Sequence, residues 1–137
     1  MNNYLYNYMN QENFYKNNNN NNNSLFDPYN AFIRGNLFKN LYDPYNNKEP
    51  YEIKPINEQA RLLTKINSLC FSLKDLNLYL DVYPNDNNMI NLYNKYNQEK
   101  EKLTKDYENM YGPICLNSDA LNSYPWSWED THWPWEN

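Results

Sequence analysis

Two consecutive stretches of the sequence carry apolar residues at alternating steps of four and three positions, and a proline lies between them. This spacing keeps side chains on one stripe of an α-helix. The two stripes consist of Leu62, Ile66, Leu69, Leu73, Leu76, Leu80 and Tyr83, then Met89, Tyr93, Tyr96, Lys100, Leu103, Tyr107 and Met110. Lys100 alone departs from the apolar pattern. We therefore predict an all-α fold in which residues 57–111 form an antiparallel hairpin of two long helices.

Residues that start and stop helices lie at both ends of each predicted helix. Residues 83–86 read Tyr-Pro-Asn-Asp, and the proline disfavours a helical conformation for the residue before it. Asn85 or Asp86 can then cap the second helix, as Asn57 can cap the first. Gly112 is followed by a proline, which is typical of a helix C-terminus. The hairpin is therefore predicted to span 57–112, with a short turn.

Composition divides the rest of the chain into three flanking segments. The mean hydropathy is −1.09, and 15 tyrosines supply much of the apolar content. We predict a disordered Tyr- and Asn-rich segment at 1–23, an aromatic and Pro-rich segment at 24–56, and a Trp- and Pro-rich tail at 113–137. The uninterrupted asparagines at 17–23 have no apolar face to bury, which favours a linker over a self-associating tract.

The predicted hairpin is too small to bury its apolar residues alone. Apolar residues off the main stripes predict a second buried face; they are Leu63, Phe71, Leu78, Tyr79, Ile90 and Leu92. Three covers are open: residues 26–45 in cis, a second copy in a homo-oligomer, or a different protein. Within 24–56, a Leu-aromatic-Asp-Pro-Tyr-Asn sequence occurs at 25–30 and again at 41–46. Gly35 lies between the two copies, and we expect one helical turn on each side of it.

All four tryptophans lie in the C-terminal tail, at 126, 128, 133 and 135. The neighbouring prolines exclude helix, and a spacing of two puts each pair on one side of an extended segment. Tryptophan often dominates protein interfaces, so the tail is a candidate anchor for a partner. The tail folding back onto its own hairpin stays an open alternative. The partner-binding residues that we predict are Trp126, Trp128, Trp133, Trp135, Phe32, Phe38 and Tyr42.

Several classes of function find no support in the sequence. The net charge of −5 and the absence of a basic cluster argue against nucleic acid. We expect no secretory leader, because the first 15 residues hold no apolar run, and no membrane span, which needs about 20 apolar residues. The one histidine, His132, and two distant cysteines make no metal motif, so we expect no cofactor, no metal and no enzyme activity. Cys70 and Cys115 are predicted as separate thiols, with Cys115 the candidate for intermolecular crosslinking.

The order of these motifs resembles the CotJB family of spore-coat assembly proteins. The resemblance covers residues 57–136 and rests on Tyr-Leu-Asp-Val-Tyr-Pro-Asn-Asp at 79–86, Tyr-Gly-Pro-Ile at 111–114, Trp-Ser-Trp at 126–128 and Trp-Pro-Trp-Glu at 133–136. Residues 31–45 separately look like the end of CotJA, a small companion coat protein. The chain thus resembles a fusion of the two.

The resemblance implies a non-enzymatic structural adaptor that helps to assemble a CotJ-type complex. The partners it implies are CotJA-like and manganese-catalase-like coat proteins, with manganese chemistry belonging to the second. It also implies synthesis in the mother-cell cytoplasm and deposition in the spore coat. Two alternatives stay open: a regulatory subunit of the catalase-like enzyme, and a carbohydrate-binding module of the spore envelope.

Overall fold

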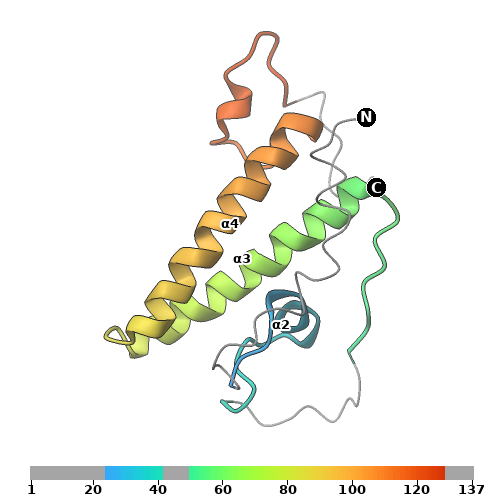
Figure 1. Cartoon of the computed structure of the whole chain (residues 1–137). Helices are drawn as coiled ribbons and strands as arrows, with labels where there is room; N and C mark the ends of the chain where they lie inside the picture. The colour runs from blue at the N-terminus through green and yellow to red at the C-terminus, as the bar shows by residue number, and fades with distance from the viewer. Residues whose placement is uncertain (1–23, 42–49, 129–137) are drawn as a thin grey trace.

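The computed structural model describes residues 24–41 and 50–128. Two long helices, α3 (Glu58–Val82) and α4 (Asn87–Tyr111), run antiparallel and pack along each other. The short helix α2 (Pro28–Arg34) lies against α3, and a 3-10 helix, η1 (Asp119–Leu121), follows α4 (Figure 1). The described part of the chain contains no β-strand beyond an isolated bridge. The predicted all-α hairpin is confirmed.

The predicted caps set the ends of the two long helices. The side-chain oxygen of Asn57 accepts the amide hydrogen of Ala60 at 2.7 Å. Of the two candidates for capping α4, Asp86 does so: its Oδ1 accepts from the second and third amides of that helix at 3.1 and 3.2 Å. Gly112 ends α4 with φ at 97°, a region that favours glycine. Local chemistry therefore fixes the hairpin boundaries.

The core of the hairpin is the seam between α3 and α4. Its buried members are Leu62, Ile66, Leu69, Leu73, Leu76, Met89, Tyr96, Leu103 and Tyr107. Lys100 is partly buried and its ammonium donates to Asn97 Oδ1 at 3.0 Å. Two predicted seam residues stay open to solvent: Tyr83, which lies beyond the end of α3, and Met110, which is 46% exposed. The seam is thus closed over most of its length and open at Met110.

A second buried face of α3 lies beside the seam and carries serines. Ser68 and Ser72 are almost completely buried, and their hydroxyls donate to the carbonyls of Thr64 and Ser68 at 2.8 and 3.0 Å. Each hydroxyl is satisfied within its own helix, so burial leaves no unpaired polar group. Small side chains also let another segment approach α3 closely. The predicted second face exists on α3, but serines contribute to it.

Residues 24–41 cover this second face. Asp27 caps α2, Pro28 begins it, and Gly35 ends it in the left-handed region with φ at 78°. The predicted helical turn before Gly35 is confirmed, whereas the turn predicted after it is wrong. Instead, the chain turns back, and a bridge joins Leu25 to Phe38. The backbone can therefore donate to α3, and Leu37 N–H reaches Asp75 Oδ2 at 2.8 Å. The first of the three predicted covers, a segment in cis, is the one observed.

Residues 113–128 form an irregular segment beyond the last turn of α4 (Figure 1). The amide of Ile114 donates to Glu108 Oε1 at 3.2 Å, and Leu121 of η1 is buried. The Ser127 hydroxyl donates to the carbonyl of Ala120 at 3.2 Å, which draws the chain into a turn at 127–128. The extended conformation predicted for Trp126 to Trp128 is therefore interrupted by a turn. The asparagine run at 17–23 and residues 42–46 of the second repeat copy lie outside the described residues.

Candidate partner-binding surfaces

Two of the predicted partner-binding residues, Phe32 and Phe38, pack within the chain. The Phe32 ring meets Phe71 of α3 edge-on, with centroids 6.1 Å apart. Phe38 is only 7% exposed and stacks on Tyr79 with centroids 4.8 Å apart. Both rings therefore help to hold residues 24–41 on the hairpin. Tyr42 lies outside the described residues.

The C-terminal segment presents apolar side chains to solvent. Trp126 is 57% exposed, and Tyr124 and Leu116 are exposed as well. We call these three residues the C-terminal aromatic surface. Trp128 is partly buried, so the structure gives the two indoles of the first Trp pair different surroundings. Trp133 and Trp135 lie outside the described residues.

A second exposed apolar group lies where α3 ends. Leu78 is 54% exposed, and Val82 and Tyr83 beside it are also exposed. The sequence predicted Leu78 in the second buried face, and this prediction is wrong. Residues 24–41 contact Phe71, Asp75 and Tyr79, and they leave the side of α3 that carries Leu78 uncovered.

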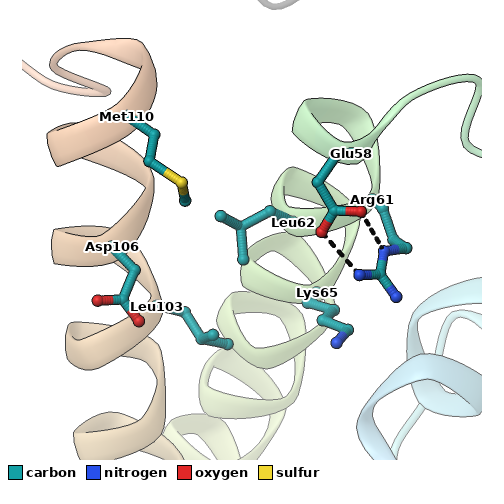
Figure 2. A pocket seen from close by; sticks show the side chains of 7 residues that line it. All are labelled: Glu58, Arg61, Leu62, Lys65, Leu103, Asp106 and Met110. Atoms are coloured by element: carbon teal, nitrogen blue, oxygen red, sulfur yellow. Dashed lines mark hydrogen bonds and ion pairs between the residues drawn. The ribbon is translucent and has the colours of Figure 1, made fainter. Parts of the chain in front are cut away.

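A groove opens between α3 and α4 at the end of the hairpin remote from the turn. The two helices lie farther apart here than near the turn (Figures 1 and 2). Leu62, Leu103 and Met110 point into the groove from opposite helices, as Figure 2 shows. Its walls also carry charged side chains, namely Glu58, Arg61, Lys65 and Asp106. The space enclosed, including its open mouth, is about 360 Å³. This groove was not predicted from the sequence, since Met110 fits the seam pattern as well as any buried residue.

The charges along the groove are partly removed from water. Arg61 pairs with Glu58 through contacts of 2.7 and 3.0 Å on the same helix. Burial lowers the pKa of Lys65, and the neighbouring Arg61 lowers it further. Burial raises the pKa of Glu99 on the facing helix, against the opposite effects of Lys95, Lys65 and Lys102. Lys65 and Glu99 therefore influence each other across the gap between the helices without forming one of the ion pairs within 4 Å.

The remaining chemistry of the described residues is sparse. Within 24–41 and 50–128, no group of three or more His, Cys, Asp or Glu side chains could hold a metal ion. Cys70 and Cys115 are both free and exposed, which confirms two separate thiols. Burial raises the pKa of the Cys70 thiol, while Lys100 lowers it in part. None of the helices described here is long and apolar enough to cross a membrane.

These features define a small all-α protein built on a helical hairpin, with a segment of its own chain packed on one face. The chain belongs to the CotJB protein family, whose sequence profile matches residues 60–136. It is therefore a spore-coat-associated protein. The match includes α4, all of α3 except its first two residues, and both tryptophan pairs, and residues 24–41 lie outside it. No curated protein and no solved structure matches the chain.

Proposed function

We propose that this protein is a non-enzymatic structural adaptor of the spore coat. The observation that carries this proposal is the C-terminal aromatic surface, Leu116, Tyr124 and Trp126, which is exposed at one end of the hairpin. Tryptophan and tyrosine contribute disproportionately to the binding energy of protein interfaces, so exposed side chains of these types are the first candidates for partner contact. The surface lies within the part of the chain that matches the family profile.

The packing of residues 24–41 on α3 reduces the number of predicted partner-binding residues that are open to a partner. Because Phe32 and Phe38 are engaged with α3, a partner would have to displace them before it could bind them. Trp126 needs no such displacement. We therefore assign the first contact with a partner to Trp126, with Trp128, Trp133 and Trp135 as further candidates in the same tail.

The partner that we propose is a manganese-catalase-like coat protein in a CotJ-type complex. The support is the family membership together with the absence of metal-ligating clusters in the described residues. In this proposal the partner carries the metal chemistry, and the present chain fixes its place in the coat. Synthesis in the mother cell precedes that assembly.

Co-purification with the catalase-like protein tests this function. Trp126→Ala is expected to weaken the complex by about tenfold or more, because truncation of a tryptophan hot spot costs about 2 kcal/mol or more. Tyr51→Ala is the matched control, since Tyr51 is an aromatic residue that is 87% exposed outside the C-terminal segment. If wild type and Trp126→Ala retained equal amounts of the catalase-like protein, the C-terminal aromatic surface would not be the binding site.

The same preparation separates the adaptor from its rivals. An adaptor leaves catalase turnover and manganese content unchanged, whereas a regulatory subunit changes one of them. Binding to isolated spore polysaccharide without any protein partner would favour a carbohydrate-binding module.

We further propose that residues 24–41 are a CotJA-like segment that packs on the hairpin in cis. The resemblance of 31–45 to CotJA suggests this, and the packing of α2 against α3 is consistent with it. Expression of residues 1–49 and 50–137 as two chains tests the idea. Co-purification of the two pieces is expected, and Phe38→Ala should abolish it, whereas exposed Leu41→Ala should not.

A further inference from the structure

The groove between α3 and α4 leaves part of the hairpin seam without a cover. Met110 continues the apolar stripe of α4, yet it is 46% exposed, while Leu62 and Leu103, which also line the groove, are buried. Packed helices lie about 8–10 Å apart, and where they diverge a side chain from elsewhere must fill the gap. Among the described residues, the whole lining comes from α3 and α4, so neither 24–41 nor 113–128 fills the groove.

We propose that a second copy of this chain fills the groove with its C-terminal aromatic surface, in a symmetric dimer. Each copy inserts Trp126 into the groove of the other copy and receives the same side chain in its own. The dimer goes beyond the adaptor function and does not depend on it. One consequence does rest on that function: because the same surface is proposed to bind the catalase-like protein, dimerisation and complex formation compete.

The groove and the C-terminal aromatic surface lie at the same end of the hairpin. Residues 113–128 follow the last turn of α4, and the groove opens at that end (Figures 1 and 2). In a two-fold dimer both copies use the same patch, so that patch must contain both the inserted group and the groove that receives it. Placement at opposite ends would give an open head-to-tail chain of molecules instead. The arrangement here therefore permits a closed pair.

The charge of the groove suits an uncharged occupant. Its walls carry as many cations as carboxylates, namely Arg61 and Lys65 with Glu58 and Asp106. These charges cancel, so an acidic or a basic segment would gain no net attraction, whereas the C-terminal aromatic surface carries no charge. Its indole N–H and phenol hydroxyl need acceptors once they are buried, and each wall carboxylate has several lone pairs.

The sizes of the two surfaces also agree. The groove encloses about 360 Å³ with its mouth, near the lower limit for pockets that hold small molecules, so it has room for one large side chain. Trp126 is 57% exposed, Leu116 68%, and Tyr124 fully. An aromatic side chain buries about 150–250 Å², so these exposed parts amount to about 400 Å² per copy. Two reciprocal contacts, with the groove surface they cover, therefore exceed the roughly 1,000 Å² of a specific interface.

Sedimentation equilibrium of the full chain alone tests the dimer, from about 1 μM to about 1 mM. We expect the mass to rise from 16.7 kDa to twice that value as the concentration increases. Trp126→Ala removes the inserted side chain and Met110→Glu places a carboxylate in the groove, so each variant loses both contacts. Each should raise the dissociation constant about a hundredfold or more, because a central tryptophan is worth about tenfold or more per contact. Leu78→Glu, a similarly exposed apolar position near the other end of α3, is the control and should change nothing.

A mixture of the two variants distinguishes insertion into the groove from other modes of dimerisation. The Trp126→Ala chain keeps its groove and the Met110→Glu chain keeps its tryptophan, so a mixed pair restores one of the two contacts. The mixture is therefore expected to associate about tenfold or more tightly than either variant alone. A dimer in which the two tryptophans stack on each other would gain nothing from mixing.

Each possible outcome decides the question. A wild-type chain that stays monomeric at about 1 mM would overturn the proposal, as would a dimer that either variant leaves intact or a mixture that associates no more tightly than its components. A mass that keeps growing past the dimer would indicate an open head-to-tail contact and would overturn it too. A monomeric chain whose Met110→Glu variant no longer binds the catalase-like protein would assign the groove to that protein instead.

Two controls keep these outcomes interpretable. Far-ultraviolet circular dichroism shows whether each variant keeps its helices, and Met110→Lys replaces Met110→Glu if the latter does not. Because the chain is measured alone, failure of the dimer leaves the adaptor function standing, and loss of the adaptor function leaves the dimer standing.

Discussion

Ser72 of α3 gives the sharpest test of how residues 24–41 pack on the hairpin. Its side chain is completely buried, and it shares one face of α3 with Asp75 and Tyr79, which contact Leu37 and Phe38. The fold needs this position to be small. It does not need it to be polar, because the hydroxyl bonds only to the carbonyl of Ser68 in the same helix.

Two substitutions separate size from polarity. Ser72→Ala removes a hydrogen bond worth about 0.5–1.5 kcal/mol to a carbonyl that also has a helical partner. It gains about 0.5 kcal/mol of helix propensity, so the net change should be within about 1 kcal/mol. Ser72→Leu keeps a good helix former but adds two heavy atoms to a packed contact. Overpacking of this kind costs about 1–3 kcal/mol.

Urea denaturation followed by circular dichroism measures both values. The leucine variant is expected to lose clearly more stability than the alanine variant, and its Leu37 amide should exchange faster with solvent. If Ser72→Leu were as stable as wild type, residues 24–41 would not lie against this face. If Ser72→Ala were the more damaging variant, polarity rather than size would control the position.

Three further predictions concern individual side chains. Asp86→Ala deletes the cap of α4 and should lower the free energy of unfolding by about 0.5–2 kcal/mol in the same urea assay; a change near zero would contradict the capping role. Burial raises the pKa of Glu99 above its ordinary value of 4.5, so its contribution to stability is greatest below that pH and is lost as the pH rises through the raised pKa. Glu99→Gln should therefore raise the thermal midpoint at neutral pH and match wild type in acid, whereas parallel pH profiles would refute the assignment. Burial also raises the pKa of Tyr96 to about 12, so the late part of an ultraviolet titration of tyrosine ionisation should be reduced by Tyr96→Phe; a late part that this variant leaves unchanged would contradict the burial of Tyr96.

The hairpin could be predicted from the sequence because its determinants are local. The step of four and three along 62–80 requires only the geometry of one helix. Asn57, Asp86 and Gly112 act on amides and torsions within a few residues of themselves. Such features do not depend on which segments meet in space, so they are readable from the chain alone.

The cover of the hairpin could be predicted only in outline, because it depends on contacts between distant segments. Ser68 and Ser72 look like solvent-facing residues, and only their bonds within α3 make burial tolerable. The turn after Gly35 is not helical, because the backbone there bonds to Asp75, 38 positions beyond Leu37. No local sequence pattern predicts that Asp75 is the hydrogen-bond partner of Leu37.

The groove was hidden from the sequence for a different reason. Met110 lies in phase with the buried residues of α4, and its exposure follows from the divergence of the two helices. The burial predicted for Leu78 was wrong for the same kind of reason. The covering helix α2 contains seven residues and leaves that side of α3 uncovered. Apolar periodicity shows which residues can be buried, and packing partners decide which of them are.

Hydrogen exchange of the isolated chain in dilute solution tests the central claim, that residues 24–41 are a fixed part of the hairpin. The amides of Phe26, Leu37 and Lys39 donate at 2.8–2.9 Å to Leu37 O, Asp75 Oδ2 and Ser24 O. They should exchange slowly, and Asp75→Ala should accelerate Leu37. Exchange of all three at the rate of an unfolded peptide, with α3 and α4 still protected, would contradict the account.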